Sequence, residues 1–162
     1  MQDQFKNFIR VLESFDQHEV QYVLIGGVAM VLHGMERLTR DIDVFVKIEP
    51  QNIEKLRKAL YEVFEDDSIE EITPGELQKY PVIRYGTPDD FYIDIMARIG
   101  EMFTFEDLGY EIIEYHGTKI RIATPDTLFK LKKNTIRERD KIDALFLRNL
   151  IDFRKSDRSN KK

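Results

Sequence analysis

The sequence predicts an α+β protein: a small mixed β-sheet with flanking helices and a helical C-terminal end. Three observations predict it. Apolar residues near the N-terminus recur at helical spacing, alternating or wholly apolar stretches fill the middle, and two helical patterns close the chain. A chain of 162 residues can bury a core as one unit. We therefore expect one domain over residues 1–153 and a disordered basic tail over 154–162.

The first half of the chain is expected to alternate helices with strands. Phe5, Phe8, Leu12 and Phe15 follow helical spacing and predict a helix over 3–17. The elements predicted next are a short buried strand that stops at Gly26 and Gly27, a short helix over 28–34, a strand over 41–48 and a long helix over 51–64.

The second half is expected to contain two hairpins followed by helices. Residues 82–86 and 91–99 are predicted strands, with "TPDD" as the turn between them. Residues 110–123 predict another hairpin that turns at His116 and Gly117. The two C-terminal helices are predicted over 125–135 and 137–153.

Charge is distributed unevenly along the chain, although the net charge is only −5. Residues 130–162 hold 12 of the 25 lysines and arginines but 5 of the 30 acidic residues. This basic segment could meet a polyanion such as RNA or a nucleoside triphosphate, or it could be a solvated helix face.

Composition narrows the functional classes. The chain has no cysteine, which excludes disulfides, thiolate metal sites and a thiol nucleophile. No apolar run approaches the length of a membrane span, and the N-terminus does not resemble a signal peptide. We therefore expect a cytoplasmic protein with no membrane contact. The three histidines are scattered without metal-ligand spacing, and no role is assigned to them.

Gly26 and Gly27 follow an apolar strand and precede a predicted helix. Backbone without Cβ atoms can approach an anion closely, and the start of a helix favours phosphate. A tight turn between strand and helix is the alternative explanation, and the glycine pair alone does not decide between them.

Asp41 and Asp43 lie two residues apart in a predicted strand, so both point to the same face. Their Cα atoms are expected roughly 6–7 Å apart from the strand rise. Asp94 has a similar setting between Ile93 and Ile95. Three aspartates on neighbouring strands can hold two divalent cations, which is the equipment for phosphoryl or nucleotidyl transfer. An acidic solvent face is the alternative for the Asp-x-Asp pair alone.

The stretch "IGGVAMVLHGMERLTRDIDVFV" with the later "YIDIM" resembles the nucleotidyltransferase superfamily, the polymerase-β-like fold. The likeness covers about residues 20–147 and is greatest to a small bacterial branch. The C-terminal "LFKLKKNTIRERDKIDAL" is similar to the AbiEii-type toxin members. The second glycine position is often serine in the superfamily, so Thr39 or backbone amides would replace its hydroxyl here.

The resemblance implies a Mg²⁺-dependent nucleotidyltransferase. Gly26 and Gly27 would hold the phosphates of a nucleoside triphosphate, and Asp41, Asp43 and Asp94 would bind two Mg²⁺ ions. Asp94 would also help deprotonate the acceptor hydroxyl, which attacks the α-phosphorus and expels pyrophosphate. The acceptor stays open between RNA such as tRNA, a small molecule and a protein, and a protein antitoxin is a candidate partner.

Five further residues receive conditional roles. Lys132 could reach the triphosphate or be a solvated lysine. Arg37 and Arg40 could contact phosphate or pair with the aspartates. Asp140 and Asp143 share a helix face and could orient Lys132 or a basic partner, or they could form salt bridges with Arg139 or Lys141.

Two other classes remain possible on the residues alone. One is a catalytically inactive protein of the same fold that acts as an interaction or toxin–antitoxin module, since a fold does not guarantee an activity. The other is a metal-dependent phosphatase or nuclease, which would use the same carboxylates but would not need the glycine turn.

Overall fold

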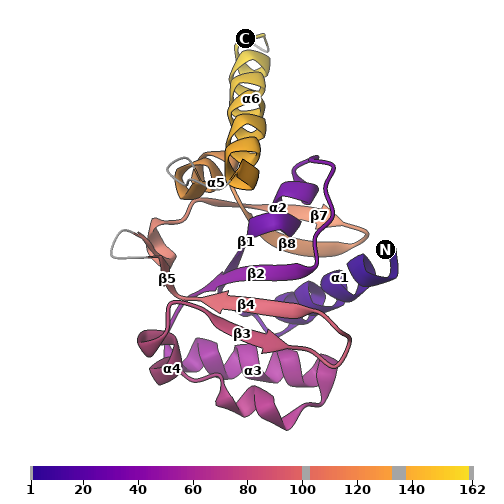
Figure 1. Ribbon diagram of the computed structural model, residues 1–162, viewed down its shortest axis with the longest axis vertical. Helices are drawn as coiled ribbons and strands as arrows, with labels where there is room; N and C mark the ends of the chain where they lie inside the picture. The colour runs from indigo at the N-terminus through magenta and orange to yellow at the C-terminus, as the bar shows by residue number, and fades with distance from the viewer. Residues whose placement is uncertain (1, 100–102, 133–137, 161–162) are drawn as a thin grey trace.

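The computed structural model describes residues 2–99, 103–132 and 138–160, and it confirms the predicted α+β fold (Figure 1). Within these residues a six-stranded sheet has the order β3-β4-β2-β1-β8-β7. Its strands are β1 Tyr22–Ile25, β2 Asp41–Val46, β3 Ile83–Gly86, β4 Tyr92–Met96, β7 Tyr110–Tyr115 and β8 Thr118–Ala123.

The sheet is mixed, as predicted. β1 pairs antiparallel with β2 and parallel with β8, while β2 pairs parallel with β4. β3–β4 and β7–β8 are the two predicted hairpins, the second turning at His116 and Gly117. The parallel β2–β4 pair matters most for the site, because it brings together two strands that are distant in sequence.

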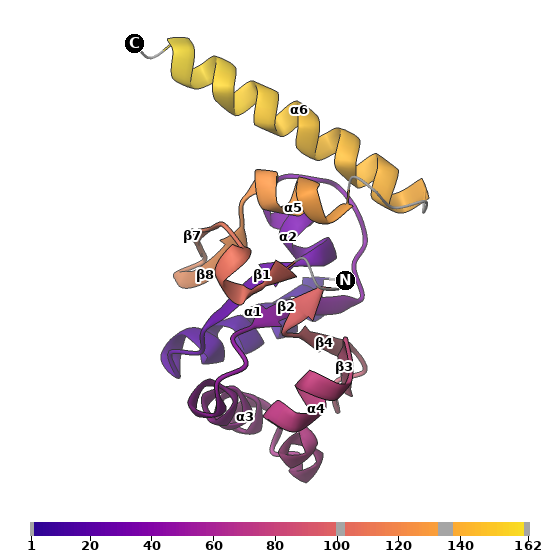
Figure 2. The same ribbon diagram turned by 90° about the vertical axis from the view of Figure 1, so that its left-hand side faces the viewer.

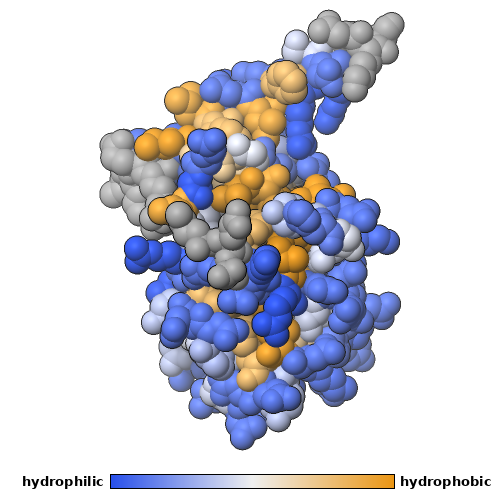
Figure 3. All heavy atoms as spheres, turned by 90° about the vertical axis from the view of Figure 1, so that its right-hand side faces the viewer, coloured by the Kyte–Doolittle hydropathy of each residue, from blue (hydrophilic) through white to orange (hydrophobic). Residues whose placement is uncertain are grey.

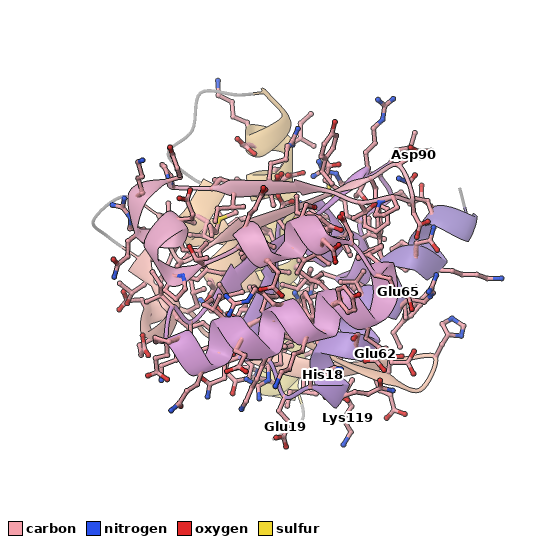
Figure 4. The ribbon with its side chains drawn as sticks, turned by 90° about the horizontal axis from the view of Figure 1, so that it is seen from below. His18, Glu19, Glu62, Glu65, Asp90 and Lys119 are labelled. Carbon is pink, nitrogen blue, oxygen red and sulfur yellow. The ribbon has the colours of Figure 1, made fainter. Side chains whose placement is uncertain are left out.

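Two helices pack together along one face of the sheet. α1 (Gln2–Gln17) and α3 (Pro50–Phe64) contact each other, and α1 also contacts β8. The Ser14 hydroxyl donates a 2.7 Å hydrogen bond to the Ala59 carbonyl, and His18 contacts Glu62 where the two helices meet (Figure 4). α3 ends at Phe64, and the next residue, Glu65, has a φ of 48° that stops the helix.

The other side of the sheet carries α2 and the C-terminal helices (Figure 2). α2 (Gly26–Leu32) packs on β1 and β2, and α5 (Pro125–Lys132) packs on α6 (Glu138–Asn160). α6 extends well beyond the sheet in both views (Figures 1 and 2). The core between the layers contains fully buried aromatic residues, and the Phe8 ring meets the Phe91 ring edge-on at 5.1 Å.

Several elements differ from the sequence prediction. α2 begins at Gly26, so the glycines form its first turn instead of preceding it. The strand predicted over 91–99 breaks after Met96, and β5 (Arg98–Ile99) pairs with β6 (Phe103–Thr104) as a separate ribbon. Three short helices were not predicted: η1 Asp67–Glu71, α4 Pro74–Lys79 and η2 Phe105–Asp107.

The C-terminal segment also differs from its prediction. α6 continues to Asn160, so residues 154–160 are helical where a disordered tail was expected. The segment contains no glycine or proline to stop the helix, and the Arg154 guanidinium donates to the Glu111 carboxylate at 3.2 and 3.3 Å. Residues 133–137 of the two predicted helices, and residues 161–162 of the tail, lie outside the described residues.

No helix in the described part of the chain is both long and apolar enough to cross a membrane.

Candidate active site

The strand pairing places the three predicted aspartates side by side. Ile42 and Val44 are fully buried, whereas Asp41 and Asp43 alternate with them on the opposite face of β2. Asp43 is directly opposite Asp94 in the parallel β2–β4 register. The Asp41 carboxylate also accepts a 3.3 Å hydrogen bond from the backbone N–H of Tyr92, which holds it over β4.

Gly26 lies against the Asp43 carboxylate. Asp43 is paired with Ile25 across the β1–β2 ladder, so the chain turns into α2 directly beside it. A Cβ atom on Gly26 would lie 2.1 Å from Asp43 Oδ2, and Gly26 has a φ of 73°. Both the space and the backbone conformation therefore require glycine at this position.

The Asp43 carboxyl is in an unfavourable place for a negative charge. Burial raises its pKa to about 6, and the nearby carboxylates of Asp94 and Asp41 act in the same direction. The positive charge of Lys132 acts in the opposite direction and lowers this pKa. A second positive charge at this site would therefore relieve a real repulsion.

The second glycine lies beneath Thr39. A Cβ on Gly27 would lie 2.9 Å from the Thr39 methyl group and 3.6 Å from Arg37 Cζ. The Thr39 side chain thus occupies the space beside position 27, where superfamily members often carry serine. Arg40 is exposed, and among the described residues its guanidinium forms no ion pair with Asp41 or Asp43.

Asp140 and Asp143 orient Lys132, which is one of the alternatives that the sequence analysis predicted. Its ammonium donates to Asp143 Oδ2 at 2.8 Å and to Asp140 Oδ1 at 3.2 Å. Arg37 donates to the same Asp143 oxygen at 2.7 Å, so it pairs with α6 instead of with the β2 aspartates. Asp143 is 1% exposed. This cluster joins α5, α6 and the loop before β2 beside the carboxylates.

Arg84 is the residue that the sequence analysis missed. It lies on β3 opposite Asp94, and its guanidinium donates to both Asp94 oxygens, Nε at 2.9 Å and Nη2 at 3.1 Å. Nη2 also reaches Asp41 Oδ2 at 3.4 Å. Counting outward from the predicted turn pairs residue 84 with residue 93, whereas the structure pairs it with Asp94, so the predicted hairpin missed this contact by one residue.

The donor set suits a hard divalent cation such as Mg²⁺, which prefers carboxylate oxygens. The charge on Asp43 is disfavoured by its neighbours, and Gly26 leaves room for that carboxylate. No group of three or more His, Cys, Asp or Glu side chains among the described residues is arranged to hold a metal ion. Arg84 holds two of the three carboxylates. The residues therefore fit the cation in chemistry, while in this structure two of the three carboxylates are paired with an arginine.

A hollow of about 310 Å³ on the described surface lies away from the carboxylates. It is lined by residues of α5 and α6, namely Asp126, Phe129, Arg148, Ile151, Asp152 and Lys155. It neighbours a smaller hollow to which Arg154 and Arg158 contribute. We place the candidate active site at the aspartates, because the hollows contain no comparable set of unbalanced charges.

A family model for the nucleotidyltransferase AbiEii toxins of type IV toxin–antitoxin systems matches residues 10–156. The chain belongs to this family. The match confirms the resemblance found in the sequence and makes the protein a nucleotidyltransferase. Among curated proteins, none matches the chain.

Solved structures support the same fold for this AbiEii-family protein. The lincosamide antibiotic adenylyltransferase LnuA, bound to lincomycin, is similar with a TM-score of 0.60 and 20% identity, over 88% of this chain and 95% of LnuA. An antigenic nucleotidyltransferase-like protein from Paracoccidioides brasiliensis is similar with a TM-score of 0.58 and 16% identity, over 91% of this chain and 77% of that protein. A candidate nucleotidyltransferase from Thermotoga maritima is similar with a TM-score of 0.53 and 13% identity, over 94% of both chains. At these identities the likeness shows the fold alone.

Proposed function

We propose that this AbiEii-family protein transfers a nucleoside monophosphate from a nucleoside triphosphate to a hydroxyl acceptor in the presence of Mg²⁺, with release of pyrophosphate. The observation that carries the proposal is the row of Asp41, Asp43 and Asp94 beside Gly26. These carboxylates lie on one face of adjacent strands, and burial together with the neighbouring carboxylates raises the pKa of Asp43.

Each residue of the site has a role in this scheme. Asp41, Asp43 and Asp94 would hold the divalent cations, and the backbone at Gly26 and Gly27 would hold the phosphates of the triphosphate. Bound cations would neutralise the charge of the triphosphate and the charge that develops during transfer. Lys132, held by Asp140 and Asp143, presents its ammonium to the phosphates. Thr39 and Arg40, beside the glycines, are the remaining candidates for nucleotide contacts.

The bonds, the leaving group and the proton of this transfer are accounted for as follows. The acceptor oxygen bonds to the α-phosphorus, and the bond from that phosphorus to the bridging oxygen of the β-phosphate breaks. Pyrophosphate leaves with that oxygen. Asp94 takes the hydroxyl proton, for which its position on β4 beside Asp43 is suited.

The acceptor is open among three classes. The basic segment over residues 130–162 favours an RNA such as tRNA. The adenylyltransferase LnuA, whose structure holds lincomycin, makes a small hydroxylated molecule a second candidate. A protein side chain is the third. The family's toxin–antitoxin description further leads us to propose an antitoxin as the partner that controls this activity.

The proposal is tested by incubating the protein with nucleoside triphosphates labelled at the α-phosphate, Mg²⁺, and tRNA or cell extract. We expect label in an acceptor and stoichiometric pyrophosphate, both lost with EDTA and in Asp43→Asn. Asp89→Asn, an exposed turn substitution, is the matched control and should retain transfer. Release of phosphate in place of pyrophosphate would indicate a phosphatase. Absence of both nucleotide binding and transfer would favour the inactive interaction module.

A further inference from the structure

Arg84 provides most of the positive charge that the Asp94 carboxylate contacts. Its Nε and Nη2 groups donate to the two oxygens of Asp94 at 2.9 and 3.1 Å, a two-point arrangement that is stronger than a single hydrogen bond. Nη2 also approaches Asp41 Oδ2 at 3.4 Å. One guanidinium therefore occupies oxygens of two of the three carboxylates in the candidate site.

Asp43, the third carboxylate, has no such partner in the described residues. It faces Asp94 and Asp41 with Lys132 as the positive group that acts on it. Arg84 therefore balances the carboxylates nearest β3 and leaves the β2 side of the row unbalanced. The site is only partly neutralised in this state.

The Arg84 contact is built so that it can be released. The side chain is 55% exposed, and β3 is the edge strand of the sheet. The guanidinium also stacks over the Tyr92 ring at 4.5 Å, and that ring is itself partly exposed. Arg84 is the exposed partner of this pair, whereas the Asp94 side chain is only 12% exposed, so the arginine can leave once another cation takes its place on the carboxylate.

A divalent cation and the guanidinium compete for the same oxygens. Both need Asp94, and two positive charges that contact the same carboxylate repel each other strongly. We propose that Arg84 is an exchangeable counter-cation: it pairs with Asp94 and Asp41 in the empty site and leaves them when a divalent cation binds. This inference rests on the proposed function and adds to it a residue that sets the affinity for the cation.

The inference predicts an unusual direction of effect. Removing a positive side chain next to a catalytic aspartate normally impairs a site, but here it should improve cation binding. Arg84→Gln should lower the dissociation constant for Mn²⁺ by about three- to tenfold, the factor expected for loss of one partly exposed competing ion pair. Arg84→Lys keeps the charge but not the two-point contact, so it should give an intermediate value.

The test is calorimetric titration of Mn²⁺ into the full chain at pH 7.5, where Asp43 is ionised, with no nucleotide present. Wild type, Arg84→Gln and Arg84→Lys are compared with Lys58→Gln, which removes one positive charge from an exposed position on α3. Tighter binding in both Arg84 variants, with wild-type affinity in Lys58→Gln, supports the inference. The Mn²⁺ spectrum in electron paramagnetic resonance provides an independent count of bound ions.

Two results would overturn the inference about Arg84, and they can be told apart. Equal or weaker Mn²⁺ binding in the Arg84 variants means that Arg84 stays with Asp94 while the cation is bound, and only this inference fails. No Mn²⁺ binding by any of the proteins removes the metal-dependent function proposed above together with it. Arg84→Lys keeps the comparison decisive if Arg84→Gln does not fold.

Discussion

Gly26 and Asp43 depend on each other at the scale of single residues. The glycine accepts a positive φ and leaves open the space that Asp43 Oδ2 fills, while β1–β2 pairing sets the distance between them. A side chain at position 26 would move the carboxylate away from its place beside Asp94. The position therefore combines a backbone requirement with a site requirement, and the two can be separated by experiment.

Gly26→Ala should destabilise the protein more than Gly117→Ala. Both glycines have positive φ, 73° and 84°, so both variants carry backbone strain of about 1–2 kcal/mol. A Cβ at Gly117 meets nothing within 4 Å, whereas at Gly26 it collides with Asp43, adding about 1–3 kcal/mol. Urea unfolding measures the difference. Transfer activity should fall about 100-fold in Gly26→Ala only, and equal losses in the two variants would contradict the account.

The raised pKa of Asp43 makes stability depend on pH. The folded state keeps the Asp43 proton up to a pH of about 6, while the unfolded chain loses it near 3.8. The folded state therefore binds more protons in this window, and its free energy of unfolding falls as the pH rises from about 4 to 6. Asp43→Asn removes this penalty.

In EDTA, Asp43→Asn should therefore be more stable than wild type at pH 7.5, by on the order of 2 kcal/mol, and no more stable at pH 4. Asp89→Asn should differ from wild type at neither pH. Thermal unfolding at both pH values measures this. A stabilisation that is the same at pH 4 and pH 7.5 would show that the Asp43 charge is not its cause.

The site residues differ in how far the sequence could reveal them. Asp41, Asp43 and Asp94 follow from strand periodicity, because an alternating strand needs no partner to show which face a residue takes. The glycines follow from their position between a predicted strand and a predicted helix. Arg84 depends on which strand pairs with which and in what register. The partners of Arg37 and Lys132 lie on α6, and no local pattern indicates how that helix meets the sheet.

At the scale of elements, long periodic segments were predictable and short ones were not. The helices α1 and α3 and three of the four hairpin strands agree with their predictions, and the fourth, β4, ends at Met96 where the prediction continued to residue 99. α4 spans only six residues, and the sequence at its start, Thr73 followed by Pro74, is also typical of a turn. Only the structure shows the Thr73 hydroxyl accepting from the Glu76 N–H at 3.2 Å, which makes it a helix cap.

Asp143 is expected to hold the C-terminal helices to the site. Its carboxylate receives Lys132 at 2.8 Å and Arg37 at 2.7 Å in a buried position. Asp143→Ala would leave two cations without this partner and should cost about 3–5 kcal/mol. Asp152→Ala, an exposed change on the same helix, should cost less than about 0.5 kcal/mol. Urea unfolding compares them, and similar losses would refute the anchoring role of Asp143.

At the scale of the whole molecule, α6 extends beyond the sheet and forms most of the C-terminal segment over residues 130–162, in which basic residues outnumber acidic ones. Arg148, Lys155 and Arg158 line the hollows between α5, α6 and the sheet. Ile142, Leu145 and Phe153 are each more than half exposed on the same helix, and Figure 3 shows apolar atoms gathered in this upper part of the molecule. The amino-acid composition revealed the charge asymmetry, but it did not predict that α6 extends beyond the sheet.

If the acceptor is RNA, Lys155→Gln/Arg158→Gln should weaken tRNA binding. The matched control is Lys55→Gln/Lys58→Gln, which removes two exposed positive charges from α3. Fluorescence anisotropy at several salt concentrations should show the slope of log affinity against log salt reduced by up to about 2 in the α6 variant only. Equal effects in both variants would indicate nonspecific attraction and would favour a non-nucleic-acid acceptor.

The central claim is that Asp41, Asp43 and Asp94 beside Gly26 form a cation-dependent nucleotide site. Calorimetric titration of each nucleoside triphosphate, with and without Mg²⁺, tests it most directly. The account predicts binding that requires Mg²⁺, identifies the preferred base, and disappears in Asp41→Asn/Asp43→Asn while Asp89→Asn retains it. Binding that is unchanged by the double substitution, or absent for every triphosphate, would contradict it.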